Sequence, residues 1–165
     1  MQLGVAGHAF QVAWLAADPG WVVVQIDPET GCLEHRFESA DEPVHFVQMW
    51  VLPDTDGVTP GYEQMDINGE LAKGGLQPIA SGQGHDSAIR IHQRDAVLWG
   101  GRLKAGETVS VPDGPNAHLF VALGATELEG AGALTAGDAV RLAGAGSPRL
   151  TAGPDGAEVL IWVTG

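Results

Sequence analysis

The sequence predicts an all-β domain, and three observations support this class. Short segments rich in Val, Ile, Trp and Phe recur at intervals of roughly 8–12 residues, which is the spacing of sandwiches and barrels. The chain has 24 glycines and 10 prolines among 165 residues, which predicts many turns. Helical periodicity is scarce, and the best candidate is one short helical turn in 67–75 that ends at glycines.

Each strand is expected where an apolar segment lies between two turn signals. In the segment "AIRIHQ", Ile89 and Ile91 share one face while Arg90 and His92 share the other, as a half-buried strand requires. By the same criterion the sequence predicts strands near 11–16, 21–26, 32–38, 44–51, 88–93, 96–103, 107–111, 118–123, 125–129, 138–142, 148–151 and 157–163.

The length limits the number of domains. A chain of 165 residues and 17.1 kDa suffices for one compact domain, or for one domain and part of a second. Residues 52–87 are the least periodic part and are rich in turn formers. We therefore expect an N-terminal strand segment over 1–51, a connector over 52–87 and a C-terminal barrel over 88–165.

The charge balance argues against polyanionic partners. The formal net charge is −13 and only 8 residues are Lys or Arg, whereas nucleic-acid and anionic membrane surfaces are bound by basic side chains. No apolar run reaches the roughly 18 residues that span a bilayer, and the first residues lack the features of a signal peptide. The cytoplasm is the expected location.

Several common reactive motifs are missing from the sequence. Cys32 is the only cysteine, so it has no internal disulfide partner, and its acidic neighbours favour the unreactive thiol over the thiolate. Cys32 is therefore not expected to act as a nucleophile. The chain has no G-x-S-x-G elbow, phosphate-binding loop or Cys/His zinc spacing.

Two glycine-containing segments carry a resemblance to a known superfamily. "LFVALG" (119–124) and "LTAGDAVRLAGAG" (134–146) resemble parts of the two cupin motifs. The resemblance implies an all-β cupin jelly-roll barrel with additional N-terminal strands. The positions of the cupin metal ligands would fall on Ser110, Pro112, Ala117 and Pro148, none of which is a strong ligand.

A longer match narrows the resemblance. "PVHFVQMWVLPDTDGVTPGYEQ" (43–64) resembles the pirins, which are two-cupin proteins, and the later segments extend the likeness to residues 43–163. In pirins an H-x-H pair and an H-x-E pair of the N-terminal cupin hold the metal, while the C-terminal cupin ordinarily has none. Here residues 1–42 contain no H-x-H, so the resemblance implies a truncated pirin-like protein without its usual metal site.

A remodelled metal site remains as a weaker alternative. His35 matches the histidine of the family's H-x-E pair, but Phe37 stands in the place of the glutamate and Glu38 lies one residue later. On a strand, His35 and Glu38 point to opposite faces, so both reach one metal only through a bulge or turn. Such a site, with His8 or His45 added, would hold Fe, Mn, Ni or Zn; the leading expectation is no cofactor.

Three side chains are candidates for a pocket in the barrel. His118 opens the strand that lines a cupin pocket, where an imidazole orients a polar ligand or shuttles a proton near neutral pH. Trp99 and Phe120 would add aromatic surface, because ligand cavities are largely apolar. The other histidines of the described motifs are expected to be structural or solvated: His45, His85 and His92.

Two classes of function follow from these observations. The leading one is a metal-free module that binds a small molecule or a protein partner. The alternative is a small-molecule enzyme, either a metal-dependent quercetinase-like dioxygenase with a remodelled site or a metal-free isomerase or cyclase that uses His118 as acid or base. A homodimer is expected as well, because a partial N-terminal sheet leaves edges that a second copy can cover.

Overall fold

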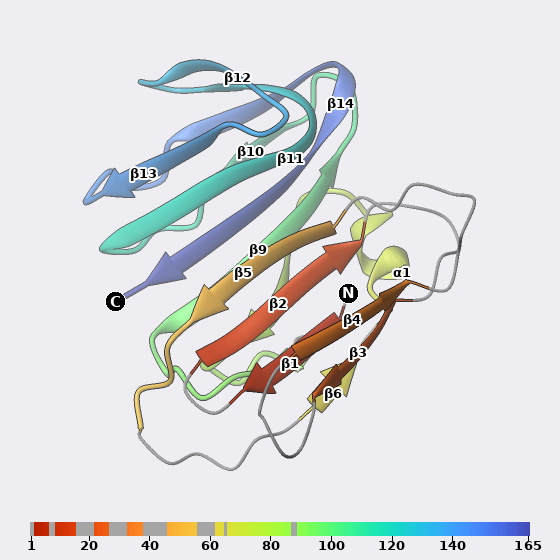
Figure 1. Ribbon diagram of the computed structural model, residues 1–165. Coiled ribbons are helices and arrows are strands. Elements are labelled where there is room, and N and C mark those ends of the chain that lie inside the picture. The colour runs from red at the N-terminus through yellow and green to blue at the C-terminus, as the bar shows by residue number, and fades with distance from the viewer. Residues whose placement is uncertain are drawn as a thin grey trace. The chain divides into compact units, whose positions relative to one another are not determined.

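The computed structural model describes residues 2–6, 9–15, 22–26, 33–37, 46–55, 62–64, 66–86 and 89–165 (Figure 1). Of these, residues 2–6, 9–15, 22–26, 33–37, 46, 48 and 62–64 are described by their backbone alone. Strands and one short helix make up the described elements, and this confirms the all-β prediction. In order they are β1 (Gln2–Ala6), β2 (Ala9–Leu15), β3 (Val22–Ile26), β4 (Leu33–Phe37), β5 (Phe46–Val51), β6 (Tyr62–Gln64), α1 (Asn68–Leu71), β7 (Leu76–Ser81), β8 (Ile89–Arg90), β9 (Ala96–Leu103), β10 (Thr108–Ser110), β11 (Asn116–Leu128), β12 (Gly132–Thr135), β13 (Ala139–Ala143) and β14 (Arg149–Thr164).

The chain divides into two compact units. The N-terminal unit comprises Met1–Asp66 and Ile89–Arg94, and the C-terminal unit comprises Ile67–Ala88 and Asp95–Gly165. Part of the predicted connector over 52–87 lies in each unit. Its later part contains β7, which pairs with β9 of the C-terminal unit. The domain bounds expected from the sequence stay a prediction.

The N-terminal unit contains a four-stranded antiparallel sheet in the order β5-β2-β1-β6, and β3 pairs with β4. After β5, the chain is joined to the segment that follows β8. The Asp54 amide donates to the His92 carbonyl at 2.9 Å, and the Asp54 carboxylate accepts from Arg94 Nε at 2.8 Å. These bonds fix the end of β5 although its partners are distant in sequence.

The C-terminal unit is built around two long strands, β11 and β14, which pair with each other along their length (Figure 1). β13 pairs with the first part of β11 and β12 with its last part, while β10 and β9 pair with the first and last parts of β14. Register shifts interrupt the β11–β14 pairing on either side of Gly124. Because bulges bend and twist a strand, both long strands contribute to the two halves of a jelly roll.

Alternation along these strands defines two faces of the sheet. On the inner face, Leu119 of β11 lies opposite Ile161 of β14, which lies opposite Trp99 of β9. On the outer face, His118 of β11 lies opposite Trp162 of β14, which lies opposite Leu98 of β9. The inner face packs into one hydrophobic core. Its buried members are Leu103, Val111, Ala117, Leu119, Val121, Leu128, Leu134, Leu150, Ala152, Ala157, Val159, Ile161 and Val163.

The helical turn predicted in 67–75 is confirmed as α1 and the turn that follows it. Leu71 of α1 is buried, and it lies beside Ile79 at a place where β9 has Gly100. The helix ends before Gly74 and Gly75, which both adopt positive φ angles. Among the helices of the described residues, none is long and apolar enough to cross a membrane.

Candidate functional site

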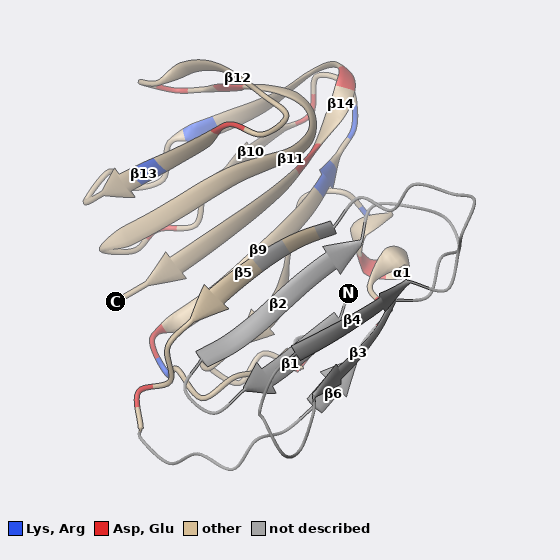
Figure 2. Cartoon of the chain, viewed as in Figure 1, with Lys and Arg blue, Asp and Glu red and all other residues tan. Residues whose placement is uncertain are grey.

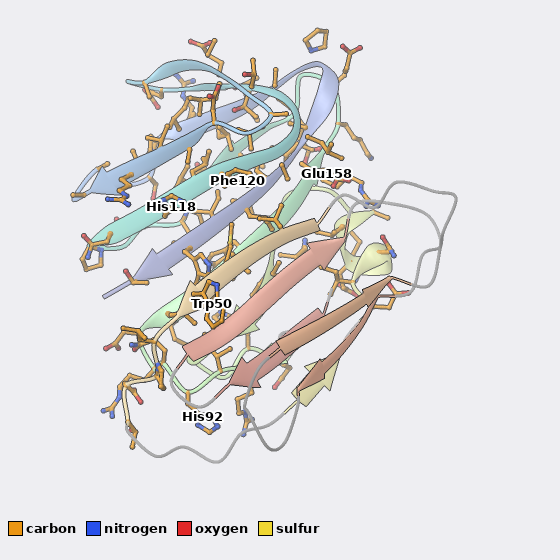
Figure 3. The ribbon with its side chains drawn as sticks, in the orientation of Figure 1. Trp50, His92, His118, Phe120 and Glu158 are labelled. Atoms are coloured by element: carbon orange, nitrogen blue, oxygen red, sulfur yellow. The ribbon has the colours of Figure 1, made fainter. Side chains whose placement is uncertain are left out.

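The three predicted pocket residues lie in two strands but not on one face. His118 and Phe120 project from β11 (Figure 3), where they are half-buried on the outer face. Trp99 lies opposite Ile161 and packs against the inner core. The register therefore places Trp99 on the other face of the sheet from His118 and Phe120. That these residues line a pocket stays a prediction.

Trp99 is instead covered by a hydrogen-bonded group from the end of β7. The rings of His85 and Trp99 meet edge to face, with 5.6 Å between centroids and 74° between planes. Ser81 Oγ lies 2.7 Å from His85 Nδ1 and accepts the Gln83 amide at 3.0 Å. Since Ser81 is 2 % exposed, its hydroxyl is closed to a substrate, and the group holds β7 against β9.

His118 lies between a cation and an indole on the outer face. Its direct cross-strand partners are Arg141 of β13 and Trp162 of β14. Burial lowers the pKa of His118 below its ordinary value, and the nearby Arg141 charge lowers it further. The imidazole is therefore predominantly neutral near pH 7, with one ring nitrogen as donor and the other as acceptor.

Arg141 and Trp162 were not among the residues expected to form a site. Strand alternation indicates which residues share a face with His118 along β11, but it does not indicate which residues of other strands lie beside it. That information resides in the register of β13 and β14. No spacing in the sequence marks these two positions, so only the structure brings them to His118.

A second polar group lies farther along the outer face, where Figure 3 labels Glu158. Glu158 Oε1 accepts from Arg102 Nε at 2.5 Å, and Asn68 Oδ1 accepts a longer contact from the same guanidinium at 3.5 Å. Glu158 Oε2 is buried and has no hydrogen-bond partner among the described residues. This ion pair joins β14 to β9, because Glu158 and Arg102 are cross-strand partners.

The four positions that the cupin resemblance assigns to metal ligands lie at different depths in the C-terminal unit. Ser110 is exposed on β10, whereas Val109 and Val111 on either side of it pack toward the core. Ala117 is part of the inner core, and the two prolines, Pro112 and Pro148, are half-buried. The buried polar atom on the described inner face is Thr126 Oγ1, which lacks a partner there.

The described residues do not fit a metal ion. Among them, no group of three or more His, Cys, Asp or Glu side chains is placed to hold one. The backbone of His35 lies in β4 opposite Val24, but its side chain is not described. Glu38, His8 and His45, together with Cys32, lie outside the described residues, so the alternative site at His35 and Glu38 stays a prediction.

Comparison with known sequences gives a consistent group of relatives. Residues 78–162, just over half of the chain, match the family described as "Quercetinase C-terminal cupin domain". The "Putative quercetin 2,3-dioxygenase Rv0181c" of Mycobacterium tuberculosis (strain ATCC 25618 / H37Rv) is 52% identical over 135 residues, which cover 81% of this chain and 55% of that protein. The "Quercetin 2,3-dioxygenase" of Escherichia coli (strain K12) is 34% identical over 55 residues, which cover 33% of this chain and 22% of that protein.

Comparison with solved structures points to the same fold. The nickel(II) complex of the bacterial pirin YhhW from Escherichia coli superposes with a TM-score of 0.74 at 17% identity, covering 98% of this chain and 74% of that chain. A second structure of YhhW gives a TM-score of 0.69 at 18% identity, covering 99% of this chain and 70% of that chain. At such identities the likeness concerns the fold. The chain spans about half the length of the curated Mycobacterium relative it matches.

Proposed function

Since the chain belongs to the family of pirin-like, quercetinase-type cupin proteins, we propose that its C-terminal cupin is a metal-free module that binds a small molecule or a protein partner through its outer surface. The proposal concerns this cupin, because the relatives extend well beyond the part that the chain matches. What they do as whole proteins does not transfer with the fold.

The packing of the inner face is the observation that carries this proposal. Leu119, Val121 and Ile161 are fully buried there, the other members of the hydrophobic cluster are aliphatic as well, and Thr126 adds one buried hydroxyl. Aliphatic side chains offer neither metal ligands nor hydrogen bonds to a substrate. Because protein interiors pack densely, this aliphatic packing supports a scaffold role for the inner face.

The outer face supplies the chemistry that the inner face lacks. It carries the imidazole of His118, the guanidinium of Arg141 and the half-buried ring of Phe120. Sites of recognition commonly combine such aromatic surface with a few polar groups. These groups support a binding role for the outer face.

Metal content is the measurement that tests the proposal. Untagged protein is incubated with Fe(II), Mn(II), Ni(II) or Zn(II), desalted and analysed by plasma mass spectrometry. We expect far less than one equivalent of each metal per chain. One equivalent of a single metal that is lost in His35→Ala, but kept in the control His92→Ala, would contradict the proposal and place a metal centre in the N-terminal unit.

A dioxygenase is the second candidate, and the names of the relatives favour it. A protein 52% identical over 135 residues is called a putative quercetin 2,3-dioxygenase. Oxygen uptake with a flavonol, measured before and after addition of Fe(II) and of a chelator, tests this candidate. Iron-dependent uptake supports the dioxygenase. Conversion that survives the chelator and is lost in His118→Gln supports a metal-free isomerase or cyclase with His118 as acid or base.

A further inference from the structure

Three hydrogen-bond donors form one row across the outer face of the C-terminal unit. Arg141 of β13, His118 of β11 and Trp162 of β14 are direct partners in consecutive antiparallel pairs. Directly opposed residues project from the same face with Cβ atoms about 4.5–5.5 Å apart. We call these three residues the donor row. Their exposure falls across it, from the exposed Arg141 through the half-buried His118 to the buried Trp162.

The donor row lacks an acceptor within the part of the chain that the structure describes. Trp162 is 7 % exposed, and its Nε1 has no hydrogen-bond partner there. Two other arginines of the same unit are paired, Arg102 with Glu158 at 2.5 Å and Arg149 with Glu129 at 3.4 Å. Arg141 instead lies opposite an imidazole. Buried donors normally find partners, so the unpaired Nε1 of Trp162 is an exception on this face. On the other side of His118, Arg141 likewise has no acidic partner among the described residues.

The charge pattern of the chain strengthens this observation. The sequence has 21 Asp and Glu residues against 8 Lys and Arg, so acidic partners for a cation are abundant. Nevertheless β13 carries Arg141 without an acidic neighbour on its own strand, and this strand shows one basic stretch in Figure 2. The Arg141 charge also disfavours the protonated form of His118, so the two side chains lack mutual stabilisation. A neutral imidazole supplies no counter-charge to Arg141, whereas an anion beside them would supply one.

The row next to the donor row is apolar. Phe120 of β11 lies between Ala139 of β13 and Leu160 of β14. Ala139 is exposed and has only a methyl side chain, and Phe120 itself is half-buried. A flat apolar group would stack there, while an attached acceptor would reach Arg141 and His118.

We propose that the donor row and Phe120 form a binding site for a small aromatic carboxylate. The carboxylate accepts hydrogen bonds from Arg141 and His118, and the aromatic body packs on Phe120 and Ala139. This site deepens the proposed function, because it gives the metal-free module a class of ligand. Arg141 supplies the charge-assisted contact and is therefore the residue on which affinity depends most.

Benzoate is the probe that tests the site in the whole chain. Titration is followed by ¹H–¹⁵N correlation spectra at pH 7 and constant ionic strength. We expect saturable shifts that centre on β11 and β13. Arg141→Gln is expected to weaken benzoate at least about tenfold, the effect of losing one charged hydrogen bond. The matched control Arg149→Gln removes an exposed arginine from β14 and is expected to leave the affinity unchanged.

Neutral benzamide separates charge recognition from aromatic stacking, and it is expected to bind at least about tenfold more weakly than benzoate. The proposal is overturned if benzoate gives no saturable shifts, or if Arg141→Gln binds it as tightly as the unaltered chain does while unfolding at the same temperature. The two proposals fail in different experiments. One equivalent of bound metal would contradict the metal-free module but not the carboxylate site. An absence of benzoate binding would contradict the carboxylate site alone.

Discussion

Glu107 connects two turns of the C-terminal unit through a single carboxylate. Its Oε1 accepts the Gly75 amide at 2.7 Å, and its Oε2 accepts the Lys104 amide at 2.8 Å. The bond from Lys104, followed by that from Gly75, lowers the pKa of Glu107 below its ordinary value despite partial burial. The turn after α1 is thereby attached to the turn between β9 and β10.

The first prediction concerns this carboxylate. Glu107→Ala leaves two backbone amides without their acceptors and is expected to lower the free energy of unfolding by about 1–3 kcal/mol. Chemical denaturation followed by circular dichroism measures the change. Glu127→Ala, which alters an exposed residue of β11, is the control and is expected to change stability little. Equal effects of the two substitutions would contradict the stabilising role of the hydrogen bonds that Glu107 accepts from Gly75 and Lys104.

The second prediction concerns Asp54, whose pKa is lowered to about 2, chiefly by the side-chain hydrogen bond from Arg94 and then by its backbone hydrogen bond. The folded-state pKa lies below the unfolded value, so this carboxylate stabilises the fold above the unfolded pKa and loses that contribution as pH falls through about 2. Arg94→Gln is expected to raise the pKa of Asp54 toward about 3.9. Carboxyl-carbon NMR titration measures it, and an unchanged midpoint would refute the assignment to Arg94.

At the scale of elements, the close pairing of β11 with β14 depends on a glycine of β11. Gly124 has a φ of 75°, and a Cβ there would lie 2.2 Å from the Gly156 carbonyl oxygen. The register shifts of β11 occur on both sides of this residue. A side chain would therefore push apart the two strands that carry most of the sheet.

The third prediction uses a matched pair of variants to separate the steric effect of a new side chain from the backbone strain at a positive φ. Gly124→Ala and Gly130→Ala both place a side chain at a positive φ, but only at Gly124 does the new methyl meet a neighbour. We expect Gly124→Ala to cost about 1–3 kcal/mol more than Gly130→Ala, the range typical of overpacking. Thermal unfolding of both variants tests this. Similar losses would show that backbone strain alone decides the effect.

Some strands of the C-terminal unit were predictable from the sequence and others were not. The spacing of short apolar segments between turn signals located β9, although this strand is largely buried on both faces and does not alternate. β7 was missed, since Pro78 interrupts its pattern and its pairing with β9 shifts register between Pro78 and Ala80. β11 and β14 were each predicted as two strands, because internal glycines resemble turns. In the structure Gly124 marks a bulge, not an end.

The candidate site was predictable only in part, for a related reason. The sequence singled out His118 and Phe120 by residue type and place on a strand, and both lie on one face. It could not add Arg141 or Trp162, because cross-strand register is a property of the folded sheet. It also grouped Trp99 with His118, although the strands present these side chains on opposite faces.

At the scale of the whole molecule, the dominant physical property is the net charge of −13. Self-repulsion of such a charge destabilises the compact state, and salt screens it. The fourth prediction is that added NaCl raises the Tm at pH 7.5 and has little effect near pH 4.5, where the net charge is close to zero. Scanning calorimetry across a salt series measures both. A Tm that falls with salt at pH 7.5 would mean that ion pairs outweigh the repulsion.

The placement of β14 has a consequence for how the protein is made. β14 pairs with β9, β10 and β11, and every one of these strands is synthesised before it. The pairs β7–β9, β11–β12 and β11–β13 can form without β14. The strands β9, β10 and β11 are joined into one sheet only after β14 has been synthesised, and until then their facing edges are open to other pairings.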